Sequence, residues 1–570
     1  MRLRATLIAA GLACALAAPA VAQEQPLSSN DPTQALPPPP QTSAPLDLNR
    51  PSPAGDAGST AIAGLSLQGA NFTGARAVAE AALRPAWTPY IGRDVTYADL
   101  RAIARKAEEI YRNAGYPFVA VVVPPQEIQG GIVNFVVVEG RISDLTVVGD
   151  DPTARRQATA AFQPLLDREP LSGAELQRSY ELARTVPGLS MAGALRRGSK
   201  PGGMDLVVQT RRRDWRAYVN ANNLFSDPVG PWGVLVGADF FGASMYGDQT
   251  SFQAYTTFET DEQQVLRFSH SRRINARGTT VNLSYLWAQA SPQGAVAPLD
   301  LATDVNAARI EVAHPLVLRP SLSVWATAGF DYADQMTDVF TSIPITEDKT
   351  RVATLQVSGQ WRPTDDRTVH FAAEVRRGLD VLDASAEGQP LASRPEGNPE
   401  ALVIRASLDG EMEISDRWRV FARFEGQSSE DPLLAPEEYS IGNLSIGRGY
   451  DPGSALGDSA AGLTVESRWG PYPIVNGRFR YAPFIFYDGV RYWNEDSFGV
   501  RARTLASAGV GLRLDMPGHG RLDLTWAKPL NEPLGIGEKT PGSRLLINFT
   551  ATWDDLAEGL YRQARRGIGR

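Results

Sequence analysis

The sequence predicts a membrane-spanning antiparallel β-barrel of about sixteen strands that is preceded by two small α+β domains. Three observations favour this fold class. Apolar and polar residues alternate from Trp215 to Trp553, in segments of about ten residues, the length that a tilted strand needs to cross an outer membrane. One pattern of strands and helices occurs twice before that region. The N-terminus has the features of a secretory signal.

The composition excludes several classes of protein. The 570 residues include 56 basic and 64 acidic side chains, for a net charge of −8, which argues against a nucleic-acid partner. The mean hydropathy is −0.22. No apolar run of about 18 residues lies beyond the extreme N-terminus, so a helical membrane protein is excluded. Alternating barrel strands keep the average hydropathy low, so a barrel remains compatible.

The first 60 residues are predicted to hold a signal and a linker. Arg2 and Arg4 precede an apolar stretch, and Ala20-Val21-Ala22 is typical of a cleavage site, so residues 1–22 are expected to be a signal peptide. The single cysteine, Cys14, lies inside it, and after cleavage no disulfide or thiol chemistry is possible. Residues 23–60 are proline-rich and predict an extended linker.

Residues 61–141 are predicted to form the first α+β domain. Thr96 and Asp99 form a capping-box pattern at the start of a helix that Gly115 ends, and Gly130-Gly131 joins two β-branched runs into a hairpin. The expected elements, in chain order, are a strand, two helices and two strands: Leu65–Gly69, about Asn71–Leu83, Thr96–Ala114, Val119–Val123 and Ile132–Val138.

Residues 142–213 repeat that order and are predicted to form a second domain of the same kind. Ser172 and Glu175 form a second capping-box pattern. The expected strands are these: Leu145–Gly149, Leu189–Leu195 and Met204–Thr210.

Residues 214–553 are predicted to form the barrel. In a representative segment, Trp418, Val420 and Phe424 share one face, and Arg419 and Arg423 share the other. A charged inner face suits a barrel with lipid outside and water inside, whereas a soluble sandwich, the alternative, keeps its inner face apolar. The side chains expected in the lumen are these: Glu374, Arg376, Arg405, Asp409, Arg419, Arg423, Arg513 and Asp515. Residues 554–570 are a C-terminal extension with the pattern of a basic amphipathic helix.

The connection from Gln427 to Asp458 contains an unusual tripeptide, Arg448-Gly449-Tyr450. An arginine between glycines, followed by an aromatic residue, can present a guanidinium from a tight turn. Further along, Phe486 and Asp488 share one strand face and Gly489 follows. If that face is the lumen, Asp488 is expected to pair with Arg448, because an unpaired charge among aromatic rings is costly.

The chain offers little for catalysis. Its four histidines are far apart in sequence and none lies in a metal-ligand pattern, and no glycine loop is suited to a phosphate. We therefore expect no catalytic residues, no metal and no cofactor, and a protein that is not an enzyme. A Ser-His-acid site assembled in the barrel wall stays open as an alternative.

These residues carry a resemblance to two-partner secretion transporters of the haemolysin-activator and filamentous-haemagglutinin-transporter type, within the superfamily of POTRA-bearing outer-membrane barrels. The stretch from Gly115-Tyr116-Pro117 to Val138-Glu139-Gly140-Arg141-Ile142 resembles the end of the family's first POTRA domain. Arg448-Gly449-Tyr450 resembles the tip of its lumen loop, and Phe486-Tyr487-Asp488 resembles the paired strand motif. The chain departs from the family at Gly447, which is usually valine.

The resemblance implies a pore in the cell outer membrane that recognises and secretes a large exoprotein in unfolded form. The POTRA-like domains would lie in the periplasm and bind this partner by strand addition. The residues expected at the binding edges are these: Val119, Val121, Val123, Leu189 and Met191. A monomer surrounded by outer-membrane lipid is expected. The alternatives are an outer-membrane assembly insertase of the same superfamily, a passive porin, and a receptor with scaffold domains.

Overall fold

The computed structural model describes residues 65–554, except residues 167, 201, 244–246, 341, 476, 498–501, 518 and 534–541. The predicted signal peptide, the linker and all but the first residue of the C-terminal extension lie outside the described residues. The chain divides into two compact units, an α+β unit and a barrel unit.

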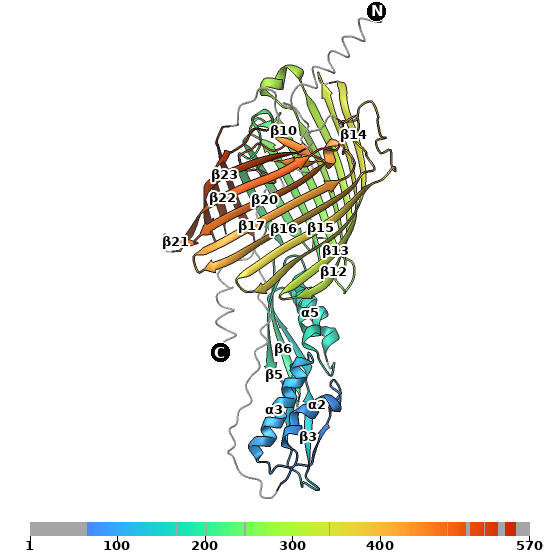
Figure 1. Ribbon diagram of the computed structural model, residues 1–570, viewed down its shortest axis with the longest axis vertical. Helices are drawn as coiled ribbons and strands as arrows, with labels where there is room; N and C mark the ends of the chain where they lie inside the picture. Colours follow the sequence, from blue (N-terminus) through green and yellow to red (C-terminus); the bar gives the residue numbers. More distant parts are fainter. Residues whose placement is uncertain are drawn as a thin grey trace, which may run out of the picture. The chain divides into compact units, whose positions relative to one another are not determined.

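The first module of the α+β unit is a three-stranded sheet with helices on one face. Its strands run in the order β1-β3-β2, with β1 parallel and β2 antiparallel to the central β3 (Figure 1). Phe72 stacks on Phe135 at 5.0 Å between ring centroids, in a core that Leu83, Leu100 and Ile103 complete. The elements are these: β1 Gly69–Thr73, α2 Glu80–Trp87, η2 Thr88–Tyr90, α3 Tyr97–Asn113, β2 Val119–Val122 and β3 Ile132–Glu139.

The predicted order of elements in this module is confirmed, but its first two elements lie later than expected. The capping box at Thr96 and the end of α3 near Gly115 are confirmed. The strand predicted at Leu65–Gly69 is wrong, because residues 69–73 are the ones that pair with β3. Leu65 is nevertheless buried, which explains its strand-like alternation. The helix predicted from Asn71 therefore begins only at Glu80.

The second module repeats the first, with the strand order β4-β6-β5. The capping box predicted at Ser172 is half right. The Ser172 hydroxyl accepts the Glu175 N–H, whereas the Glu175 carboxylate forms an ion pair with Arg168 at 2.9 Å. The elements are these: β4 Arg141–Val148, α4 Pro152–Phe162, η3 Gln163–Leu165, α5 Gly173–Arg184, β5 Leu189–Arg197 and β6 Gly203–Arg212.

The two modules are joined by the same residues that carry the family resemblance. The Gly173 N–H donates to the Gly115 carbonyl, and the Leu171 N–H donates to the Gly140 carbonyl, both at 3.0 Å. Gly140 must lack a side chain, since a Cβ there would lie 2.2 Å from the Phe118 carbonyl oxygen. The junction is therefore fixed by backbone contacts at close range.

Glu139 organises the core of the first module from the same motif. Its carboxylate is buried and accepts the N–H groups of Arg76 and Ala77 at 2.8 and 2.7 Å, and the Tyr111 hydroxyl at 2.9 Å. Burial, together with this carboxylate, raises the pKa of Tyr111. The carboxylate thus holds the segment before α2 against α3.

The barrel unit is a closed antiparallel sheet of sixteen strands within the described residues (Figure 1). The last strand, β25, pairs with the first, β7, and β21 continues the wall strand that begins as β20. The strands are these: β7 Trp215–Asn222, β8 Gly233–Phe241, β9 Asp248–Thr257, β10 Gln263–Arg273, β11 Thr280–Ala290, β12 Ala302–Arg319, β13 Leu322–Val339, β14 Ile343–Thr364, β15 Arg367–Gly378, β16 Leu402–Ser415, β17 Trp418–Ser429, β20 Ser459–Trp469, β21 Tyr472–Ile474, β22 Phe479–Trp493, β23 Arg503–Met516, β24 Gly520–Pro529 and β25 Arg544–Asp554.

The longest connections of the barrel share one rim, although the β13–β14 connection at that rim has only three residues. β14 to β15 and β16 to β17 are joined by two-residue turns, whereas 379–401 and 430–458 are long. Outer-membrane barrels have short periplasmic turns and long extracellular loops. The long connections therefore mark the extracellular rim.

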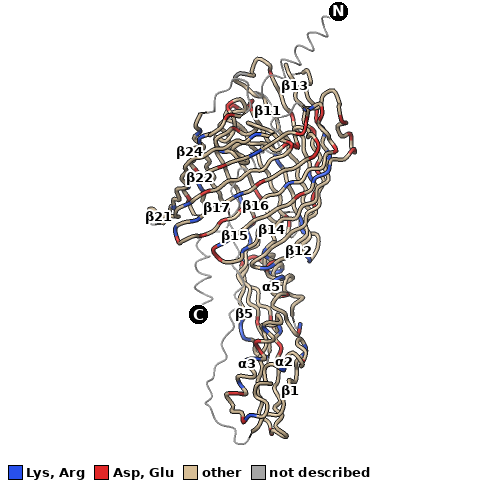
Figure 2. Tube along the Cα trace, in the orientation of Figure 1, with Lys and Arg blue, Asp and Glu red and all other residues tan. Residues whose placement is uncertain are grey.

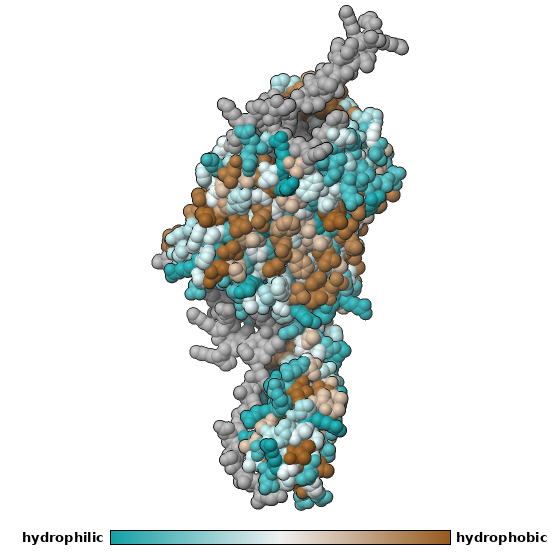
Figure 3. All heavy atoms as spheres, viewed as in Figure 1, coloured by the Kyte–Doolittle hydropathy of each residue, from teal (hydrophilic) through white to brown (hydrophobic). Residues whose placement is uncertain are grey.

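The outer wall is apolar and the inner wall is charged, as the alternation predicted. Figure 3 shows apolar side chains over the outside of the barrel. Exposed apolar residues of the wall strands include Leu408, Phe424 and Ile485, whose exposed fractions are 50%, 40% and 49%. Figure 2 shows both signs of charge along the same strands. An apolar outside and a charged inside are the arrangement of a barrel in lipid.

Within the described residues, the helices are too short or too polar to cross a lipid bilayer.

Candidate functional site: the lumen loop

The connection 430–458 between β17 and β20 folds into the barrel. It holds a short helix, η6 Ala435–Glu437, and two short antiparallel strands, β18 Tyr439–Ile441 and β19 Ala455–Gly457. Side chains of the loop and of the wall line one cavity of about 530 Å³. We call residues 430–458 the lumen loop, 442–454 its tip, and the segments 430–438 and 458 its root.

Arg448, at the tip, binds two carboxylates of neighbouring wall strands. Its Nη2 and Nε donate to the two oxygens of Asp488 on β22, at 2.7 and 3.0 Å, and its own backbone N–H donates to Asp488 at 3.0 Å. Its Nη1 donates to Glu466 on β20 at 2.5 Å. The Asp488 side chain is 1% exposed, so this charge is stabilised by its partners.

The predicted partner strand motif is placed in part as expected. Phe486 faces the lumen, and the Arg448 guanidinium lies 3.6 Å from its ring centroid, at the range of a cation–π contact. Gly489 faces the other way. A Cβ there would lie 3.2 Å from the ring of Tyr487, an outward-facing side chain. Gly489 therefore contributes nothing to the Arg448 contacts.

Glycine and tyrosine fix how the tip approaches the wall. A Cβ on Gly449 would lie 2.7 Å from the Pro529 backbone nitrogen, so only glycine fits. Gly447 has a φ of +127°, where side chains are rare, which accounts for the departure from valine. Tyr450 is fully buried, and its hydroxyl donates to the Ala506 carbonyl at 2.8 Å.

Glu466 is a functional residue that the sequence did not predict. It lies on β20 opposite Phe486 and binds three arginines: Arg448, Arg468 and Arg513. Strand alternation places it on the inner face, but which strand is its neighbour follows only from the barrel register. Glu466 therefore connects the tip arginine to two arginines of the wall.

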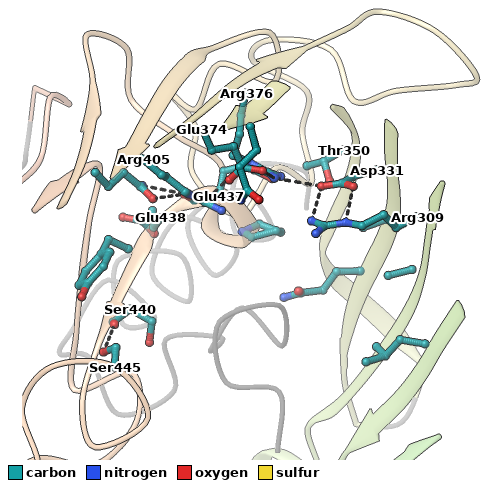
Figure 4. A pocket seen from close by; sticks show the side chains of 18 of the residues that line it. Arg309, Asp331, Thr350, Glu374, Arg376, Arg405, Glu437, Glu438, Ser440 and Ser445 are labelled. Atoms are coloured by element: carbon teal, nitrogen blue, oxygen red, sulfur yellow. Dashed lines mark hydrogen bonds and ion pairs between the residues drawn. The ribbon is translucent and has the colours of Figure 1, made fainter. Parts of the chain in front are cut away.

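The root of the lumen loop is held by a second network, drawn in Figure 4. Glu437 accepts a two-point contact from Arg376 of β15 at 2.8 and 2.9 Å. Arg376 also binds Asp331 of β13 at 3.0 Å, and Asp331 binds Arg309 of β12 at 2.6 Å. Arg405 donates to the Glu437 carbonyl at 3.1 Å.

The predicted lumen residues form such networks with one another and with the loop. Glu374, Arg376 and Arg405 line the cavity beside the root. The others face the lumen nearer the short-turn rim or along β23, where they are paired in this way: Asp409 with His370, Arg419 with Glu413, Arg423 with Glu425, Arg513 with Glu466 and Asp515 with Arg521.

The predicted binding residues of the α+β unit lie on edge strands, with buried side chains. β2 and β5 end their sheets. Val119, Val121, Leu189 and Met191 are at most 6% exposed, and Val123 follows β2 and is half-buried. The predicted side chains are therefore mostly covered, whereas Val122, which lies between them on β2, is 47% exposed.

Two family models match this chain. One, described as a ShlB-type POTRA domain, matches residues 65–140. The other, described as "Haemolysin secretion/activation protein ShlB/FhaC/HecB", matches residues 203–514. The chain belongs to this family. It is an outer-membrane transporter of the two-partner secretion type, and in this family the POTRA domains are periplasmic.

Relatives and solved structures are similar to this chain over most of its length. The heme/hemopexin transporter protein HuxB of Haemophilus influenzae is 21% identical over 459 residues, which cover 79% of this chain and 80% of that protein. The structure of CdiB from Escherichia coli matches with a TM-score of 0.71 at 16% identity, over 90% of this chain and 94% of that one. CdiB from Acinetobacter baumannii matches with a TM-score of 0.61 at 15% identity, over 88% and 91%.

The transporter shows no arrangement of ligands for a metal in the described residues. No group of three or more His, Cys, Asp or Glu side chains there could hold an ion. His370 contacts Asp409 at 3.1 Å, and no serine takes part in that contact.

Proposed function

We propose that this transporter secretes one large, unfolded exoprotein through its barrel, and that the Arg448–Asp488 pair holds the lumen loop in the secretion-competent state. The observation that carries the proposal is the guanidinium of Arg448, held between two wall carboxylates inside a barrel of this family. With no nucleotide site in the sequence, the direction of transport has to come from folding of the exoprotein outside the cell.

The test is secretion of the protein encoded in the adjacent reading frame, in a heterologous host with and without this chain. Arg448→Ala is expected to abolish or strongly reduce its export while the barrel remains inserted, because both carboxylates then lose the loop cation. Arg417→Ala, at an exposed short turn, is the matched control. Normal secretion by the Arg448 variant would remove the role assigned to this pair.

We further propose that the exoprotein adds a strand to the edges of β2 and β5 through main-chain hydrogen bonds. Support comes from the position of β2 and β5 at the ends of their sheets. On β2, the Val121 N–H already donates to the Glu108 carboxylate of α3 at 3.0 Å. A substrate strand has to displace this carboxylate before its own carbonyl can accept that N–H.

Glu108→Ala is therefore expected to raise the affinity for the exoprotein about fivefold, since a competing hydrogen bond of about 1 kcal/mol is removed. Glu108→Gln keeps an acceptor and should bind like the unchanged protein. Glu109→Ala, next in sequence and paired with Lys106, is the control. Equal binding of the exoprotein to the Glu108→Ala and Glu109→Ala transporters, measured in detergent, would contradict strand addition at Val121.

An assembly insertase of the same superfamily is the alternative, and it requires a barrel seam that opens. Here β25 and β7 pair along residues 548–554 and 216–222. Asn220 adds side-chain hydrogen bonds across the seam to Asn548 at 2.5 Å and to Thr550 at 2.8 Å. These hydrogen bonds oppose opening of the seam, and this supports the secretion role. Depletion distinguishes the two, since loss of an insertase lowers many outer-membrane proteins and loss of a transporter lowers one exoprotein.

A further inference from the structure

Another arginine, besides Arg376 and Arg405, binds the root of the lumen loop at the extracellular rim. Arg394 lies in the connection 379–401 between β15 and β16, and its side chain is 12% exposed. Its guanidinium contacts both oxygens of Asp458, Oε1 of Glu438 at 3.1 Å and Asp496 at 2.5 Å. It also donates to the Leu433 carbonyl at 2.9 Å.

These partners belong to different segments of the chain. Glu438 lies on the arm of the lumen loop that enters the barrel, and Asp458 lies at the end of the arm that leaves it. Asp496 lies in the connection 494–502 between β22 and β23. One guanidinium therefore joins both arms of the loop to two neighbouring connections.

The same aspartate extends the junction through the backbone. Asp458 is fully buried and accepts the N–H groups of Leu433 and Glu495, both at 2.8 Å. Removing Arg394 would leave this carboxylate buried with backbone donors and no countercharge. Such a site relaxes by moving the segments apart, because a buried unpaired charge is costly.

The connection that carries Arg394 also lies close against the root. The Ala435 N–H donates to the Ser393 hydroxyl at 3.0 Å, and the Asn398 N–H donates to the Pro432 carbonyl at 2.8 Å. A Cβ on Gly397 would lie 2.8 Å from a methyl group of Leu434. The root cannot rise from the barrel while this connection stays in place.

We propose that Arg394 is a positioning residue for transport, which fastens the root of the lumen loop and must release Asp458 and Glu438 before the loop can leave the lumen. The Arg448 contact cannot replace it, because Arg448 joins the tip to wall strands. Arg394 joins the root to the connections at the rim. Arg394 thus sets how often the lumen opens, independently of any exoprotein.

The test uses the full-length protein in planar lipid bilayers, with no exoprotein present. Arg394→Ala is expected to raise the frequency of large-conductance openings about tenfold, equivalent to about 1.4 kcal/mol of lost stabilisation of the closed state. Asp458→Asn should raise it less, because the amide still accepts a hydrogen bond, and Asp496→Asn should raise it least. Arg417→Ala, outside the cluster, should leave it unchanged.

A second readout follows the loop itself. Ser440, on β18, is 3% exposed, and the sequence has only Cys14 as a native cysteine. Cys14→Ser with Ser440→Cys gives one thiol, whose labelling by a membrane-impermeant maleimide should quicken about tenfold when Arg394→Ala is added. Heat-dependent gel mobility confirms that the barrel is folded. Unchanged openings and unchanged labelling in folded Arg394→Ala and Asp458→Asn proteins would overturn the proposal.

Discussion

The Arg448 contact at the tip and the root contacts of the lumen loop have opposite charge arrangements. Arg448 is a cation of the loop, and the wall supplies its anions, Asp488 and Glu466. The tip also has one contact with the arrangement of the root, between Asp451 of the loop and Arg544 of β25 at 2.6 Å. At the root, the loop supplies anions, and the cations come from the wall and from a neighbouring connection: Arg376 binds Glu437, and Arg394 binds Asp458.

Because ion pairs hold both ends of the loop, the loop resists movement along the barrel axis. If the loop slid along the barrel axis, the tip arginine would move away from its carboxylates and the root carboxylates would move away from their arginines. Each end therefore opposes displacement of the other, and both have to release before the lumen clears. The tip is fixed to paired strands, whereas the root is fixed partly to connections, so the root is expected to yield first.

The largest effect is expected from a substitution that removes the main contact of the tip with the wall. Asp488→Ala removes the carboxylate that accepts three hydrogen bonds from Arg448, and it should destabilise the docked tip by about 3–5 kcal/mol. Large-conductance openings in planar bilayers should become frequent. Asp515→Ala, a lumen aspartate 4.0 Å from Arg521, is the matched control. Conductance equal to that of the control would show that Glu466 alone holds the tip.

A smaller effect tests the fit of the tip without changing charge. Gly449→Ala places a Cβ against backbone atoms of Lys528 and Pro529, at 3.0 and 2.7 Å, and should cost about 1–3 kcal/mol. The openings should resemble those of Asp488→Ala but be rarer. Gly542→Ala, with no atom within 4 Å of its added Cβ, should behave like the unchanged protein. Equal frequencies of opening for the two glycine variants would mean that the wall near Pro529 moves to make room for the added methyl group.

The smallest expected effect is a pH dependence of channel opening that comes from the root of the loop. Glu438 lies in the connection between β17 and β18, outside the wall strands. Its burial raises its pKa to about 8, with Asp458, Asp496 and Asp348 adding to the shift and Arg394 opposing it. A released loop returns this carboxyl to an ordinary pKa near 4.3.

The docked root is therefore favoured while Glu438 keeps its proton, and it loses stability as the pH rises from about 4.3 to about 8. Openings should become more frequent over that range and level off above it. Glu438→Gln should remove most of the dependence, and any slope left in that variant belongs to other groups. An unchanged slope in Glu438→Gln would show that the root does not open by losing this proton.

The tip could be predicted from the sequence and most of the root could not. Arg448 stands out between glycines, and strand alternation alone places Phe486 and Asp488 on one face. Glu437 and Arg394 lie in connections that have no period. Their neighbours are set by how the connections fold over one another, and no local pattern encodes that.

In the first α+β module, the prediction of the first strand is wrong for a different reason. Leu65 and Leu67 alternate with polar residues as in a strand, and both are buried, but the chain there makes only the isolated bridge between Ser66 and Asp94 in the described residues. The strand is β1 because Phe72 fits beside Phe135 on β3. Alternation of apolar and polar residues shows which side chains are buried. Which residues form a β-strand depends on the partner strand with which they pair.

The sequence by itself determined the repeated α+β modules, the barrel with its lipid-facing and water-facing sides, and the arginine–aspartate pair of the tip. The modules and the barrel rest on periods of a few residues, which the local backbone geometry imposes. The arginine–aspartate pair is expected from the family resemblance and from the strand face that Asp488 shares with Phe486. Only the tertiary structure decided that Glu466 joins three arginines, that Glu108 covers the edge of β2, and that Arg394 gathers both arms of the lumen loop. Apart from Glu466 and Arg468, which are two positions apart, those contacts join residues that lie 13 to 102 positions apart in the chain. Strand register and loop packing bring them together, and neither is a local property.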